Sequence, residues 1–125
     1  MKAPVFLSLT LAVACGVAAT AQAQEAKSNL VAAGHDLAVQ VCAACHVVEN
    51  DQKSAPIMKP PAPSFSAIAQ RNDQSEPTLR KFLSTLHRNI GRTGKMPNWL
   101  LADFQIDEIV AYILSLKDGQ GSNKF

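Results

Sequence analysis

The sequence predicts an all-α protein with one domain. Two long segments place apolar residues at helical spacing, and residues typical of helix starts and ends flank them. No segment alternates apolar and polar residues as a half-buried strand does. The 125-residue chain contains no internal repeat and no linker long enough to separate two domains. We therefore expect about four helices packed around one core.

Residues 1–23 have the pattern of a cleaved export signal. Lys2 supplies an early positive charge, an apolar run follows, and Ala21–Ala23 has the small-x-small spacing that signal peptidases accept. The apolar run is shorter than the roughly 20 residues of a spanning helix. Lipid attachment at Cys15 is an alternative, but the aliphatic residue before it lies one position too far upstream. We expect a periplasmic protein of residues 24–125, cleaved near Ala23, with no stable membrane insertion.

Cys42, Cys45 and His46 form a single C-x-x-C-H motif. A disulfide between cysteines three residues apart would close a very small loop and stabilise the fold little. A structural zinc site would need a second pair of ligands, and a thioredoxin-type pair is expected beside a βαβ unit. The spacing is instead the one used for covalent haem attachment. Each thiol can add to one haem vinyl group, and a ring nitrogen of His46 can then bind the iron. The motif predicts one covalent haem c.

Three stretches of the sequence resemble the small class I c-type cytochromes of bacteria. They are residues 32–46 (AAGHDLAVQVCAACH), 61–65 (PAPSF) and 94–117 (GKMPNWLLADFQIDEIVAYILSLK). The resemblance implies an all-helical cytochrome c fold around one haem, with N- and C-terminal helices that cross. It also implies axial histidine and methionine ligands, and electron transfer as the activity.

The first helix of the mature chain is expected to begin near Asn29, a capping residue, and to run into Cys42. Gly34 matches a family glycine that allows the terminal helices to approach closely. Tyr112 matches an aromatic position on the last helix, whereas Ala38 stands where the family often has a second aromatic residue. The crossing is therefore expected to be less tightly filled here.

The last helix is expected to begin at Asp103 as its cap and to stop at Gly119, with residues 119–125 as a flexible tail. Its buried face is predicted by helical spacing and consists of Ile106, Ile109, Val110, Ile113 and Leu114. A third helix is marked by Ser75 as cap and Pro77 in the first turn. Its apolar residues are Leu79, Phe82, Leu83, Leu86 and Ile90.

The segment between His46 and Pro63 is rich in proline, so no helix can continue through it. We expect a loop that passes over the haem edge on the histidine side. The resemblance implies that the backbone carbonyl before Pro63 accepts a hydrogen bond from the His46 ring, as ligating imidazoles generally require. Phe65 and Ile68, one helical turn apart after Ser64, predict a short capped helix that lines the haem.

The sixth iron ligand is expected to be Met96, in the sequence GKMPNW and 50 residues after His46. Met58 competes, but it lies only 12 residues past His46, in the loop on the histidine side. His87 is expected to be a solvated surface residue near a helix end, and His35 to face water. Met/His ligation is an established arrangement in cytochromes c. Because both axial positions would be filled by protein, we expect an electron carrier and not an enzyme.

The chain has 12 Lys and Arg against 10 Asp and Glu, and loss of Lys2 with the signal leaves it close to neutral. A basic cluster precedes Met96 at Arg80, Lys81, Arg88, Arg92 and Lys95. It is either an ordinary solvated face or a docking face that steers an acidic partner to the haem edge. Nucleic acid is not expected, because the basic residues are not interleaved with stacking aromatics.

The sequence thus predicts a monomeric, periplasmic single-electron carrier that exchanges electrons with redox partner proteins. Two alternatives remain open. A cytochrome subunit of a periplasmic dehydrogenase would have the same motifs and differ only at its interface. A haem sensor or peroxidase-like protein would have an open coordination site at the iron.

Overall fold

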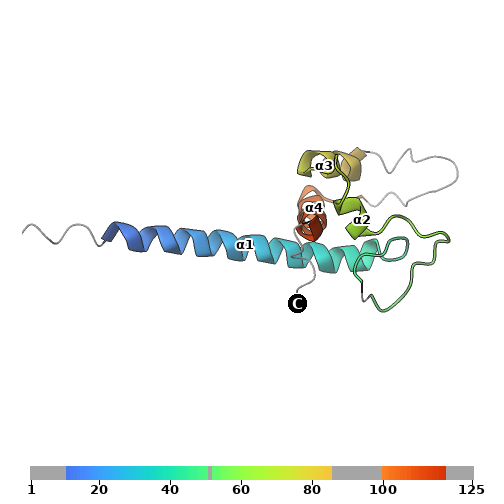
Figure 1. The fold of residues 1–125 in the computed structure, drawn as a ribbon, viewed down its shortest axis with the longest axis horizontal. Coiled ribbons are helices and arrows are strands. Elements are labelled where there is room, and N and C mark those ends of the chain that lie inside the picture. Colours follow the sequence, from blue (N-terminus) through green and yellow to red (C-terminus); the bar gives the residue numbers. More distant parts are fainter. Residues whose placement is uncertain (1–10, 51, 86–99, 118–125) are drawn as a thin grey trace, which may run out of the picture.

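The computed structural model describes residues 11–50, 52–85 and 100–117, and these fold into four α-helices (Figure 1). No strand occurs in the described ranges, where the only sheet-like pairing is an isolated parallel bridge between His46 and Ala62. The prediction of an all-α fold is confirmed. The helices are α1 (Leu11–Val41), α2 (Phe65–Ala69), α3 (Glu76–Thr85) and α4 (Asp103–Lys117).

Helix α4 lies at the centre of the fold and contacts each of the other three helices. Figure 1 shows α4 nearly end-on while α1 runs across the view, so the two helices cross steeply. The buried face predicted for α4 is confirmed. Ile106, Ile109, Val110 and Ile113 are each at most 3% exposed, and Leu114 packs against them. The core therefore forms where α1, α2 and α3 meet this one helix.

The crossing of α1 and α4 is centred on Gly34. A Cβ atom built at Gly34 would overlap the backbone carbonyl of Glu108 and would lie 3.0 Å from the Cβ atom of Tyr112. Only a residue without a side chain permits this approach. The role expected for Gly34 thus follows directly from the backbone of α4.

One expectation for the side chains at this crossing, that His35 faces water, is wrong. Ala38 is fully buried, at 0% exposure, and His35 contributes one of the ring contacts of Tyr112. The ring of His35 meets that of Tyr112 edge-on, with centroids 5.1 Å apart. The prediction that His35 faces water is wrong, because its side chain is only 20% exposed.

The start of α1 also differs from the prediction. The helix does not begin at Asn29 but runs unbroken from Leu11, through the residues expected to form the export signal. This stretch is rich in alanine and contains no proline, so nothing interrupts the backbone hydrogen bonds before Asn29. Residues 20–30 are all exposed, and the buried part of α1 begins at Val31. In the described residues no helix is long and apolar enough to cross a membrane.

The sequence predicts a capping residue for each of α2, α3 and α4, and the structure has the first two at the predicted positions. Ser64 caps α2 by accepting a hydrogen bond from the Ala67 backbone N–H at 3.1 Å. Ser75 precedes α3 and accepts from the backbone N–H of Thr78 at 3.4 Å. Asp103, however, lies in the first turn of α4 and not before it, where its negative charge interacts favourably with the helix dipole. Leu86, Ile90 and Gly119 lie outside the described residues.

We predict that Gly34→Ala lowers the free energy of unfolding of the haem-loaded protein by about 2 kcal/mol. The overlap with the Glu108 carbonyl should outweigh the roughly 1 kcal/mol by which alanine favours a helix over glycine. Denaturant titration measures the change. Gln40→Ala, at an exposed position on the same helix, is the control and should change stability by less than about 0.5 kcal/mol. A Gly34→Ala variant as stable as the parent would contradict a close crossing at this position.

Candidate functional site

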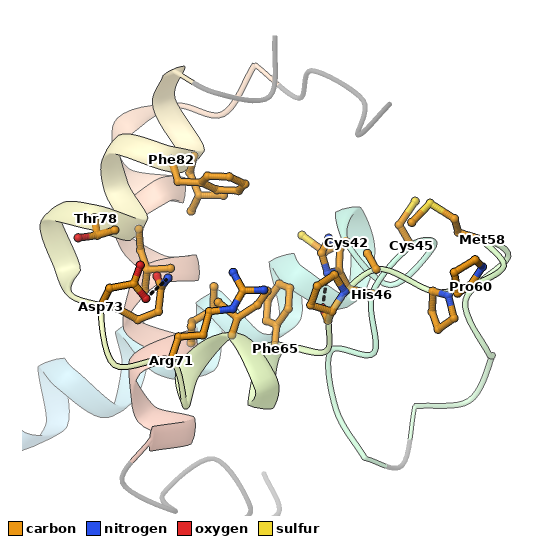
Figure 2. A pocket seen from close by; sticks show the side chains of 18 residues that line it. Cys42, Cys45, His46, Met58, Pro60, Phe65, Arg71, Asp73, Thr78 and Phe82 are labelled. Atoms are coloured by element: carbon orange, nitrogen blue, oxygen red, sulfur yellow. Dashed lines mark hydrogen bonds between the residues drawn. The ribbon is translucent and has the colours of Figure 1, made fainter. Parts of the chain in front are cut away.

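A pocket of about 690 Å³ opens between the end of α1, the following loop, α2 and α3 (Figure 2). This volume is within the usual range for small-molecule and cofactor sites. Most of its lining is apolar and comes from Cys42, Met58, Pro60, Pro61, Ala62, Pro63, Phe65, Ile68, Leu79, Phe82, Leu83 and Ile113. A largely apolar group could fill such a space.

The C-x-x-C-H motif forms one wall of this pocket. Helix α1 ends at Val41, and the backbone turns so that the N–H groups of Cys45 and His46 both donate to the carbonyl oxygen of Cys42, at 3.0 and 2.9 Å. This single turn brings both thiols and the imidazole to the pocket. Both cysteines are free thiols in the structure.

The Cys42 side chain is only 5% exposed. Burial, assisted by the neighbouring Cys45 thiol, raises the pKa of Cys42 to about 12. The free Cys42 side chain is therefore a neutral thiol near pH 7. The described part of the chain contains no group of three or more His, Cys, Asp or Glu that could hold a metal ion. The described residues therefore do not supply the four ligands of a structural zinc site.

The ring of His46 is held in one orientation. Its Nδ1 lies 2.7 Å from the carbonyl oxygen of Pro63. Because a carbonyl can only accept, Nδ1 must carry the hydrogen, and the Nε2 of the neutral ring keeps its lone pair. Phe65 meets the imidazole edge-on, with ring centroids 5.6 Å apart. His46 is 8% exposed, so it is a buried ring with one nitrogen able to bind a metal.

The acceptor differs by one residue from the expectation, which named the carbonyl before Pro63. The backbone explains the shift. The N–H of Ala62 donates to Cys45 O and the N–H of Phe65 donates to Val47 O, both at 2.9 Å. This parallel pairing leaves the carbonyl of Pro63 directed at the imidazole.

The far side of the pocket was not predicted from the sequence. It includes Arg71, Gln74 and Thr78, from the turn after α2 and the start of α3. Figure 2 shows the Arg71 side chain directed into the pocket towards Phe65, and Phe82 entering from α3. Phe82 is 37% exposed, which is typical of an apolar side chain that lines a binding site. Helical spacing marks Phe82 as apolar, but no sequence pattern marks Arg71, Gln74 and Thr78, because the pocket exists only once α2 and α3 pack on α4.

The structure thus brings together five of the six predicted site residues: Cys42, Cys45, His46, Pro63 and Phe65 all line the pocket. The sixth, Met96, and the competing His87 lie outside the described residues. Met58 lies beside Cys45 on the wall that carries His46 (Figure 2).

Comparison with known proteins gives a consistent result. The family model for cytochrome c matches residues 31–117. The chain belongs to the cytochrome c family. It is 41% identical over 100 residues to "Cytochrome c-552" of Bradyrhizobium diazoefficiens, an alignment that covers 78% of this chain and 88% of the relative. No solved structure gives a significant match.

The cofactor of this cytochrome is accordingly a covalently bound c-type haem with its iron, and its activity is haem-based electron transfer between redox partner proteins. The pocket fits that group. Apolar walls suit the flat macrocycle, two thiols and an imidazole lie on one wall, and the cationic Arg71 is available for the haem carboxylates.

We predict that replacing Cys42 and Cys45 together with alanine abolishes covalent haem retention, and that either single change weakens it. The two thiols are the only cysteines in the pocket. The measurement is haem staining of exported protein after denaturing electrophoresis. Cys15→Ala is the control and should leave staining unchanged, because Cys15 lies in the predicted signal. Haem colour that survives in the double variant would contradict attachment at these residues.

Proposed function

We propose that this cytochrome is an exported, periplasmic, monomeric single-electron carrier whose haem iron is bound by His46 and Met96. The observation that carries the proposal is the His46 geometry. Its Nδ1–H is engaged by the Pro63 carbonyl at 2.7 Å, in a pocket that also presents both thiols. The unprotonated Nε2 is then the nitrogen that binds iron, and Pro63 maintains both the tautomer and the ring orientation.

The choice of Met96 as the second ligand follows from where the other methionine lies. Met58 shares a wall with Cys45 and the proline-rich loop. A ligand on the opposite face of the haem must come from another segment. Met96 belongs to the segment that joins α3, which forms the far wall, to α4. Its place in the chain, in a different segment from the His46 wall, is the reason for choosing Met96.

This ligand pair favours electron transfer over catalysis. Bound haem supplies an iron that gains and loses one electron. The thioether of Met96 is a soft ligand that favours the reduced state and raises the potential. With His46 and Met96 both in place, the protein leaves no coordination position for peroxide or oxygen. We therefore assign no enzymatic activity at the metal.

Other residues of the pocket would hold the haem without touching the iron. Phe65, Leu79 and Phe82 would present apolar surface to the ring, and the buried Phe65 and Leu79 would exclude water from it. Arg71 is placed to form charge-assisted hydrogen bonds with a haem carboxylate.

Export is supported by the exposure pattern along α1. Residues 20–30 are exposed, and α1 is buried against α4 only from Val31 onward. Of the residues that cleavage after Ala23 would remove, residues 20–23 are exposed, and cleavage would leave residues 24–125 as one domain.

The basic cluster is only partly described, and one member is already paired. Arg80 on α3 forms an ion pair with Asp107 on α4, so its charge is partly neutralised within the fold. Lys81 is exposed. The remaining members, Arg88, Arg92 and Lys95, lie outside the described residues, and we propose these three as the docking charges for an acidic partner.

We predict that Met96→Ala lowers the reduction potential and opens a coordination position, which water or a histidine can occupy. Removing the thioether removes the ligand that favours ferrous iron. A redox titration, together with the weak near-infrared absorption that reports sulfur bound to ferric iron, measures both effects.

Met58→Ala is the matched control and should leave the potential and the near-infrared band in place, because Met58 lies on the His46 wall. A band that persists without Met96 and vanishes without Met58 would show that the ligand assignment is wrong.

We also predict that reversing the charges of Arg88, Arg92 and Lys95 slows electron transfer to the physiological partner at low salt. The effect should shrink with added salt, because the Debye length falls from about 10 Å at 0.1 M to about 3 Å at 1 M ionic strength. Stopped-flow rates measured across this range provide the test. Arg71 lies at the haem pocket. The variant with its charge reversed serves as a comparison, because it separates an effect on the reduction potential from an effect on docking. Equal rates for the parent and the triple variant at low salt would exclude docking through these residues.

A further inference from the structure

The segment that directly follows His46 is attached to two helices by side-chain hydrogen bonds. Tyr112 on α4 donates its buried hydroxyl to the carbonyl oxygen of Val48 at 3.0 Å. One residue later, the carboxylate of Glu49 lies 2.5 Å from Nε2 of His35 on α1. These two contacts connect the loop after the haem motif to α1 and to α4.

His35 has a carboxylate at each ring nitrogen. Nε2 faces Glu49, and Nδ1 lies 3.1 Å from the Asp36 carboxylate. A neutral imidazole has one N–H donor and one lone pair, so it can donate to only one of the two carboxylates while its lone pair repels the other. The imidazolium form donates to both. The geometry by itself therefore favours the protonated ring.

In the described part of the chain, the charged groups seen to contact the ring are both acidic. Helix α4 presents the ring of Tyr112 to His35, and the nearby charged residue of α4 is the half-buried Glu108, whose backbone carbonyl lies against Gly34. The groups that face His35 from its own helix and from the loop are the carboxylates of Asp36 and Glu49. All the ionisable side chains named here are acidic or, in the case of tyrosine, neutral near pH 7.

We propose that His35, Glu49 and Asp36 form a proton-binding latch that holds the segment after the haem-binding histidine onto α1 and weakens this attachment as the imidazole loses its proton. The latch binds one proton, on the His35 ring. The latch is a property of the fold that goes beyond electron transfer, and it does not depend on which residue is the sixth iron ligand.

The direction of the pH effect follows from the environment of the ring. Partial burial alone would lower the pKa of His35, but the hydrogen bonds and charges of Glu49 and Asp36 outweigh it, so the pKa is raised above its ordinary value of 6.5. A group whose pKa is higher in the folded than in the unfolded state stabilises the fold fully below the unfolded value. That stabilisation is lost as pH rises from about 6.5 through the raised pKa of the folded protein.

The first test is an NMR titration of the His35 ring in the reduced, haem-loaded protein. The latch requires a midpoint above 6.5 in the parent and a lower midpoint in Glu49→Gln, which keeps a hydrogen-bonding side chain but removes the charge. A parent midpoint at or below 6.5, or one that Glu49→Gln leaves unchanged, would overturn the proposal.

The second test compares urea unfolding at about pH 5.5 and about pH 8.5, on either side of the expected transition. Each unit by which the folded pKa exceeds 6.5 should reduce the folding equilibrium constant of the parent about ten-fold across this range, relative to His35→Asn. His87→Asn is the control and should retain the parent's pH dependence. An identical pH dependence in the parent and His35→Asn would overturn the latch even if the NMR midpoint is raised.

If His35→Asn does not fold, Glu49→Gln replaces it in the unfolding experiment, with the same expectation. Neither experiment reports on axial ligation. A failure of the Met96 assignment and a failure of the latch therefore give separate results.

Discussion

The hydrogen bond from His46 Nδ1 to the carbonyl oxygen of Pro63 is the interaction on which the site depends. It fixes the tautomer, and so it determines which nitrogen of a buried ring can bind iron. The carbonyl is directed by the backbone, because residues 45–47 and 62–65 pair in parallel through hydrogen bonds of 2.9 Å. The orientation of the His46 ring is therefore built into the main chain around the haem motif and does not rest on side-chain packing alone.

The position of that motif depends in turn on the helix crossing. Gly34 brings α1 against the backbone of α4 at Glu108, and Cys42 follows two turns later at the end of α1. The ring of Phe65 on α2 lies 6.2 Å from that of Tyr112 on α4, and Phe65 also contacts His46. The side of the pocket that carries His46 is thus connected to the core of the fold through ring contacts. We infer that changes at the crossing reach the haem by this route.

Features that depend on local sequence were predicted well. The buried face of α4, the Ser64 cap of α2 and the meeting of both thiols with His46 all follow from helical spacing or from one turn of backbone. Features that depend on tertiary packing were not. Periodicity does not say which side of α1 meets the loop after His46, so the burial of His35 was missed. The same reason explains why Arg71 was missed, since it enters the pocket only because α2 and α3 pack on α4.

A crystal structure of the protein purified with its haem tests the central claim most directly. The account predicts iron bonded to Nε2 of His46, with Nδ1 still hydrogen-bonded to Pro63, and with thioether bonds at both Cys42 and Cys45. Iron bonded to Nδ1, or to a residue other than His46 on that face, would contradict it.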